Sequence, residues 1–133
     1  MEFITANAKK NVKIQVAALK DTAALKRAVM ACLQKSSSIK NIDFNTIQEN
    51  GLKAILDIVM SLETSEEFET AVFKCLESCI IDDKHVIRPQ LFDDMPELRE
   101  DYYEIIVACC EENLRPFYKS LASALQTRLG QAE

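Results

Sequence analysis

Glycine and proline are scarce in this 133-residue sequence, which contains two glycines, three prolines and no tryptophan. Both residues mark tight turns, so their scarcity disfavours a fold of many short strands and favours helices. Long apolar runs are lacking too: residues 54–62 form the best candidate, and Asp57 interrupts it far short of the roughly 18 apolar residues that span a membrane. No basic segment followed by an apolar one opens the chain, which predicts an unsecreted, cytosolic protein.

The composition is that of a globular protein, with 48% apolar and 28% charged residues. A chain of this length buries roughly two-thirds of the surface that it exposes when unfolded, so it can form a core without metals or disulfides. We therefore expect a single domain over residues 1–133, with an extended arm over residues 1–18 and a helical body over residues 19–133.

The net charge of −5 conceals an uneven distribution along the chain. Residues 1–40 contain eight basic and two acidic side chains, whereas residues 41–112 contain five basic and 18 acidic ones. Such an acidic middle repels the phosphate backbone of nucleic acids. The sequence thus predicts neither a nucleic-acid partner nor, without a long apolar run, a membrane partner.

Apolar residues recur every three or four positions in several segments, which is typical of amphipathic helices. The first predicted helix begins at Asp21 as its N-cap and ends before Ser36. A capping box of Asn45 and Gln48 begins the second, and the third begins at Thr64. The apolar stripe of this third helix consists of Phe68, Ala71, Val72, Cys75, Leu76 and Cys79.

A fourth helix is predicted to begin at Asp94, with Pro96 in its first turn. It is apolar around more than half of its circumference, which predicts a central position in the fold. At Pro116 either one long helix kinks or a new helix begins with Asn113 as its cap, and the new helix is favoured.

Two segments lack the helical period. Residues 80–92 are predicted to form a connecting loop, while apolar and polar residues alternate over residues 12–16, as in a short strand or an extended arm. The predicted fold class is therefore all-α: a single compact domain of about five helices with an extended N-terminal arm.

The five cysteines are an odd number for a chain predicted to be cytosolic, which indicates reduced thiols. They occupy apolar helix positions, where a free cysteine acts as a small buried hydrophobe. Cys75 and Cys79 with His85 could offer three zinc ligands, but their spacing matches no standard zinc site. We therefore predict no metal and no cofactor.

No catalytic motif is present in the sequence. His85 is the only histidine, and the isolated Gly51 and Gly130 form no phosphate-binding loop. Adjacent acids such as Asp82 and Asp83 are typical of solvated surfaces. We predict a protein that is not an enzyme, with a generic helical adaptor and a small thiol or metal-dependent enzyme as the alternatives.

Large side chains gather in the sequence around the predicted junction of the last two helices. They are either the core of these helices or an apolar groove that binds an amphipathic partner helix. In the second interpretation, two neighbouring bases meet acidic residues of the partner. The candidate partner-binding residues are Tyr102, Tyr103, Leu114, Arg115, Pro116, Phe117, Tyr118 and Lys119.

Two stretches together resemble a known family. Residues 99–103, continuing into residues 112–119, are similar to the C-terminal signature of the small tail assembly chaperones of long-tailed (siphovirus-type) bacteriophages and related prophages. The segment Val12–Ile14 and the helix with Leu25 and Lys26 are similar to their N-terminal region. The resemblance implies a mostly helical protein that acts only by binding: it holds the phage tape measure protein in solution until tail tube subunits polymerise around it.

The same resemblance implies where such a protein acts and what else it contacts. It would work in the host cell cytoplasm and be absent from the mature virion. A longer form made by ribosomal frameshifting would recruit the tail tube protein, and self-association is a further possible contact.

Overall fold

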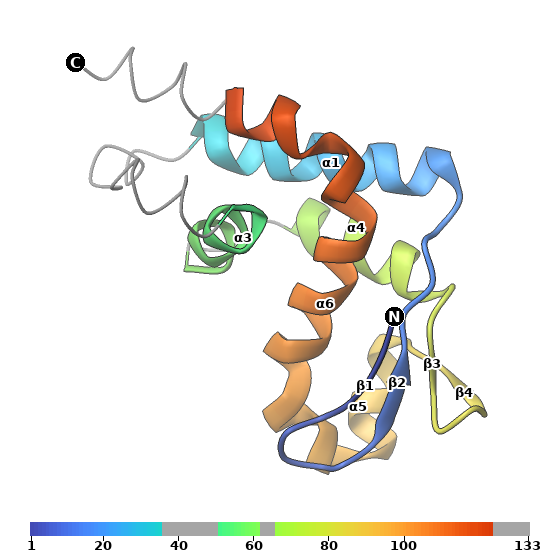
Figure 1. Ribbon diagram of the computed structural model, residues 1–133. Coiled ribbons are helices and arrows are strands. Elements are labelled where there is room, and N and C mark those ends of the chain that lie inside the picture. Colours follow the sequence, from blue (N-terminus) through green and yellow to red (C-terminus); the bar gives the residue numbers. More distant parts are fainter. Residues whose placement is uncertain (36–50, 62–65, 124–133) are drawn as a thin grey trace.

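The computed structural model describes residues 1–35, 51–61 and 66–123, in which helices stand above a small sheet (Figure 1). The α-helices are α1 (Leu19–Lys35), α3 (Leu52–Ser61), α4 (Glu66–Leu76), α5 (Pro89–Asp94) and α6 (Tyr102–Leu114). Two 3-10 helices, η2 (Pro96–Asp101) and η3 (Arg115–Phe117), flank α6. The strands are β1 (Glu2–Ile4), β2 (Asn11–Lys13), β3 (Ile80–Ile81) and β4 (His85–Val86).

The first predicted helix is confirmed as α1, which buries Leu25, Val29 and Leu33. Its start differs from the prediction, because α1 begins at Leu19 and Asp21 lies inside the first turn rather than at the N-cap. A carboxylate in this turn still faces the positive end of the helix dipole.

Helices α3 and α4 confirm the next two predicted helices. Helix α3 buries Ile55, Leu56 and Val59, and α4 buries most of its predicted apolar stripe. The predicted starts of both helices, namely the capping box of Asn45 and Gln48 and the N-terminal Thr64, lie outside the described residues.

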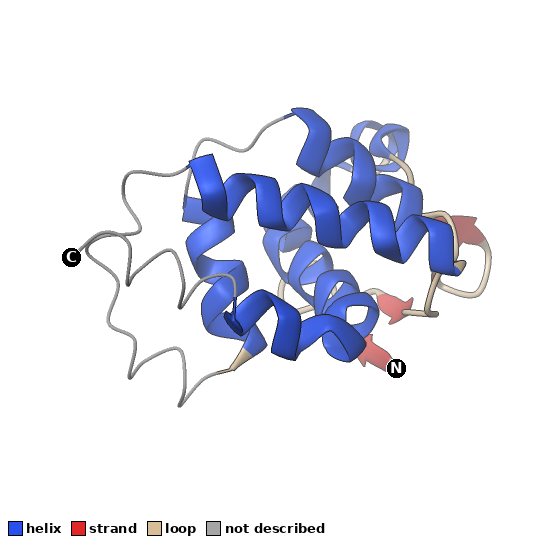
Figure 2. Cartoon of the chain, turned by 90° about the horizontal axis from the view of Figure 1, so that it is seen from above, coloured by secondary structure: helices blue, strands red, loops and turns tan. Residues whose placement is uncertain are grey.

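The all-α prediction is wrong, because the strands form a four-stranded antiparallel sheet in the order β1-β2-β3-β4. Val12 of β2 lies opposite Ile81 of β3, and both side chains are fully buried. The N-terminal segment is therefore part of the core rather than an extended arm, although the fold remains mostly helical. Figure 2 shows the strands gathered on one side of the molecule.

The hairpin between β3 and β4 lies where a loop was predicted. Asp82 and Asp83 adopt φ angles of 53° and 60° in its turn, a left-handed conformation that glycine normally supplies. The Asp82 carboxylate accepts a hydrogen bond from the backbone N–H of Asn11 at 3.1 Å and lies 3.7 Å from the Lys10 ammonium. These contacts attach the turn to β2. Helix α5 then begins at Pro89, so the second half of the predicted loop is also ordered structure.

The predicted cap at Asp94 is wrong, since Asp94 is the last residue of α5 and the chain continues as the 3-10 helix η2. Helix α6 begins only at Tyr102. Its central position is confirmed, because every residue from Ile105 to Cys110 is buried. Among the described residues, no helix is long and apolar enough to cross a membrane.

The chain does not begin a capped helix at Asn113, as was predicted. The Asn113 side chain is buried, accepts a hydrogen bond from the Ala17 backbone N–H at 2.9 Å and donates one to the Cys109 carbonyl at 2.9 Å. The helical backbone instead passes through η3, because Pro116 has no N–H to donate, and is helical again over residues 118–123. The chain bends there (Figure 1), and the Lys26 ammonium of α1 lies 5.3 Å from the centre of the Phe117 ring.

Candidate functional site

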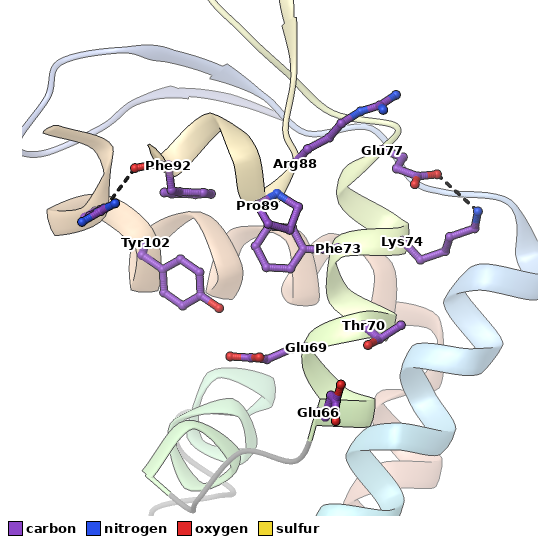
Figure 3. Close-up of a pocket in the computed structure, with 11 residues that line it drawn as sticks. Glu66, Glu69, Thr70, Phe73, Lys74, Glu77, Arg88, Pro89, Phe92 and Tyr102 are labelled. Atoms are coloured by element: carbon purple, nitrogen blue, oxygen red, sulfur yellow. Dashed lines mark hydrogen bonds and ion pairs between the residues drawn. The ribbon is translucent and has the colours of Figure 1, made fainter. Parts of the chain in front are cut away.

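A groove of about 810 Å³ lies between α4 on one side and α5, η2 and the start of α6 on the other (Figure 3). Three aromatic rings form its floor: Phe73 of α4, Phe92 of α5 and Tyr102 of α6. The ring centres of Phe92 and Tyr102 are 5.4 Å apart, and the centre of the Phe73 ring is 6.2 Å from each of them. We call this site the aromatic groove. Its floor is a continuous apolar surface, because such packed rings leave no space between them.

The floor is held in place by the residues beneath and beside it. Arg99 of η2 donates a hydrogen bond from Nε to the Phe92 carbonyl at 3.0 Å and forms an ion pair with Asp93 at 2.8 Å. Phe92 itself is buried, whereas Phe73 and Tyr102 are half-buried and partly open to the groove. The first contact joins α5 to η2 on the wall of the groove that faces α4.

The rim of the groove is charged, and acidic and basic side chains are unevenly distributed along it. Glu66 and Glu69 are exposed on α4, and neither forms an ion pair with another described residue. Further along α4, Lys74 and Glu77 neutralise each other across 3.3 Å. Arg88, just before α5, is exposed on the opposite wall. The beginning of α4 is therefore an acidic edge.

The acidic edge changes the pKa of one residue in the floor of the groove, Tyr102. Burial raises the pKa of the Tyr102 phenol, and the nearby Glu69 carboxylate raises it further. A tyrosine phenol is protonated at neutral pH even at its usual pKa of about 10, so Tyr102 can donate a hydrogen bond. The lining offers apolar contact and charge pairing, which are properties of a protein-binding surface.

A second, shallower groove lies between α1 and α4, with a volume of about 650 Å³. Its lining is rich in alanines that let the two helices approach closely. It shares Glu66 and Thr70 with the aromatic groove, so the exposed face of α4 separates the two. The alanines are Ala24, Ala28, Ala31 and Ala71.

Of the predicted partner-binding residues, only Tyr102 lines the aromatic groove. Tyr103 is 45% exposed on another side of α6, and its hydroxyl donates a hydrogen bond to the Asp57 carboxylate of α3. That bond is the main reason why the pKa of Tyr103 rises to about 12. Leu114 is fully buried and contributes to the core.

The other predicted residues lie at the far end of α6. This helix has 13 residues, so its ends are roughly 20 Å apart. Arg115, Pro116 and Lys119 are exposed there, with Arg115 paired to Glu112 at 3.1 Å. Phe117 is half-buried, with the Lys26 ammonium over its ring. The Tyr118 hydroxyl lies 3.8 Å from the position that a Cβ atom would take if Gly51 carried a side chain. The eight predicted residues therefore do not form one surface.

Sequence reasoning missed Phe73 and Phe92 as site residues. Phe92 was placed in the predicted loop. Phe73 lies between two members of the apolar stripe of its helix but points away from that stripe. A large aromatic side chain outside the core-facing stripe was the available signal for an exposed binding surface.

None of the five cysteines forms a disulfide, and four are buried: Cys75 in α4, Cys79 just after it, and Cys109 and Cys110 in α6. Burial, with Asp21 and Cys79 nearby, raises the pKa of Cys75 to about 12. The hydrogen bond between Cys109 and Cys79, together with burial, strongly raises the pKa of Cys109. His85 is exposed on β4, and the described part of the chain contains no group of three or more residues that could hold a metal ion. Cys75 and Cys79 are packing residues, as predicted.

Comparison with known proteins gives one match. No curated protein and no solved structure matches the chain. The family model described as "Phage tail assembly chaperone protein, TAC" matches residues 6–126, which include strands β2 to β4, the described helices and the aromatic groove. The chain therefore belongs to the phage tail assembly chaperone family, in agreement with the resemblance found in its sequence.

Proposed function

We propose that this chaperone binds the phage tape measure protein and keeps it in solution until tail tube subunits polymerise around it. The family supplies the setting, namely tail assembly. The observation that supports a binding role is the aromatic groove, whose half-buried rings and unpaired rim charges are available to a partner. A tape measure chain exposes long apolar stripes before assembly, and a small acidic protein that covers them would both bury these stripes and add repulsive charge.

The proposal is that the protein works by binding alone, without catalysis or a cofactor. It would act in the host cytoplasm and be absent from the mature virion. Contact with the tail tube protein through a frameshifted longer form is part of the same proposal. Some of the predicted residues are well placed to contact a partner. Tyr102 lies in the groove, and Arg115, Pro116 and Lys119 are exposed at the far end of α6.

Co-expression tests the proposal. The tape measure protein of the same phage is produced alone, with this protein, and with an unrelated acidic helical protein of similar size as a control. The proposal expects soluble tape measure protein, and a recoverable complex, only with this protein. Equal insolubility in all three cultures, with no complex in a pull-down, would contradict it.

A further inference from the structure

The shape of the aromatic groove fits one face of a helix. One of its walls is α4, whose 11 residues from Glu66 to Leu76 extend over about 16 Å or three helical turns, and Glu77 follows directly. The aromatic floor extends from Phe73 on this wall across the groove to Phe92 and Tyr102 (Figure 3). A bound helix would place side chains spaced three and four residues apart on the three rings, as amphipathic helices do in apolar grooves.

The rim charges give the groove a direction. Glu66 and Glu69 form its acidic end, whereas Arg88 lies on the other wall towards the Glu77 end (Figure 3). The remaining rim charges are already satisfied, since Lys74 pairs with Glu77 and Arg99 pairs with Asp93. The charges still open to a partner are therefore acidic at one end and basic at the other.

A second copy of this chain that presents its own residues 41–112 is a poor occupant of the groove. The protein has a net charge of −5, and residues 41–112, which include the groove, contain 18 acidic and five basic side chains. A second copy binding through this acidic region would bring like charges to the rim, which opposes association. A partner helix with basic residues matches the acidic end.

We infer that the aromatic groove holds an amphipathic helical segment of the tape measure protein, with lysine or arginine beside Glu66 and Glu69 and an acidic residue about three turns away beside Arg88. This inference rests on the proposed function and adds to it the chemistry of the bound segment and its orientation. Large apolar side chains of the segment cover Phe73 and Tyr102, while the charged ends set the direction in which it binds.

Charge reversal at the rim tests the inference with the full-length protein. The double variant Glu66→Lys/Glu69→Lys is co-expressed with the tape measure protein, beside the wild type and a matched control, Glu97→Lys/Glu100→Lys. The control makes the same charge change at exposed positions that do not line the groove. We expect the groove variant to recover about tenfold less tape measure protein than the wild type, the control to match the wild type, and Arg88→Glu to lose binding as well.

The outcomes separate the inference from the proposed function. If the wild type recovers no tape measure protein, the proposed function fails and the inference fails with it. If the wild type and both Glu66→Lys/Glu69→Lys and Arg88→Glu recover it equally, the proposed function stands and the groove is not the site. Thermal unfolding of each variant, followed by circular dichroism, shows that a loss of binding is not a loss of fold.

Cross-linking identifies the occupant directly. A photo-reactive phenylalanine at the exposed Thr70, on the α4 wall, is compared with the same group at Glu97 outside the groove. We expect only the Thr70 position to yield a cross-linked tape measure peptide, and this peptide to be amphipathic with lysine or arginine at one end. A product that joins two copies of the chaperone, or an acidic tape measure peptide, would overturn the inference.

Discussion

The Asp101 carboxylate accepts a hydrogen bond from the Ala8 backbone N–H at 2.8 Å, although 93 positions separate the two residues. The other carboxylate oxygen accepts from the backbone and the side chain of Asn7, each at 2.9 Å. Asp101 is buried at the end of η2, so this one side chain connects the β1–β2 turn to the helix that leads into α6.

Replacement of Asp101 by Asn is expected to destabilise the fold by about 2 kcal/mol, because hydrogen bonds from backbone N–H groups to a buried carboxylate lose their charge. Urea unfolding measures the change in the free energy of unfolding. Glu104→Gln is the control, since Glu104 accepts from the Ala6 N–H at an exposed position and should cost less. If both variants lose the same free energy of unfolding, Asp101 contributes no more to stability than Glu104 does.

The stability that Asp101 provides should depend on pH. Burial alone would raise its pKa, but hydrogen bonds from Ala8 and Asn7 outweigh burial and hold the pKa below the usual value. The stabilisation is therefore present above the unfolded-state pKa of about 4 and is lost as the pH falls through the lower, folded-state pKa. Thermal unfolding between neutral pH and pH 2 should show wild type and Asp101→Asn converging in acid; a constant gap would be inconsistent with this account.

The two aspartates of the β3–β4 turn should respond in opposite ways to replacement by glycine. Asp83→Gly is expected to raise the free energy of unfolding by about 0.5 kcal/mol, because a left-handed residue loses its Cβ strain. Asp82→Gly removes the carboxylate that contacts Asn11 and Lys10, so it should destabilise instead. Chemical denaturation measures the free energy of unfolding of both variants. A loss of stability in Asp83→Gly would contradict the prediction.

Removal of the Asn113 side chain should be costly, because it leaves the Ala17 N–H without its acceptor in the core. We expect Asn113→Ala to lower the free energy of unfolding by about 2 kcal/mol. Arg115→Ala, two residues further on, removes only a surface ion pair and should change it by about 0.5 kcal/mol or less. If the two variants unfold at the same denaturant concentration, Asn113 does not have the role that its hydrogen bonds indicate.

The buried thiols should react slowly in the native protein. The pKa of Cys75 is about 12, and those of Cys109 and Cys110 are also raised, so these three thiols are protonated at pH 8 as well as shielded from solvent. The hydrogen bond with Cys109 lowers the pKa of Cys79, so Cys79 is protected by its burial alone. A colorimetric thiol reagent should find five thiols in denaturant and at most one fast thiol, Cys32, in the native state. Rapid reaction of several thiols without denaturant would show that the core is more open than described.

The sequence predicted the longer helices because their apolar period extends over many residues. In α4 the stripe of Phe68, Val72 and Cys75 is buried as expected, and α6 is central as expected. Alternation over residues 12–16 indicated a strand or an arm near β2, but the other strands have only two or three residues each, which is too short for an alternating pattern to be distinct. The turn between β3 and β4 also lacks the glycine that marks such hairpins, since Asp82 and Asp83 take its place.

The aromatic groove could be predicted only in part. Tyr102 was identified as a candidate, but its neighbours Phe73 and Phe92 come from segments 29 and ten positions away, and only tertiary packing brings the three rings together. The same limit applies to Asn113: its sequence position three residues before Pro116 is typical of a helix cap, whereas its partner, Ala17, is 96 positions away.

Because synthesis proceeds from the N-terminal side, the pairing of β2 with β3 delays completion of the sheet. The first strands to leave the ribosome, β1 and β2, have to wait for β3 and then for Asp101 before their hydrogen bonds and buried contacts are complete. During that interval Val12 and Ile14, which are buried in the finished protein, are exposed on an open strand edge. A nascent chain that stops before α6 is therefore itself prone to aggregate, so this chaperone must finish its own translation before its N-terminal sheet is protected.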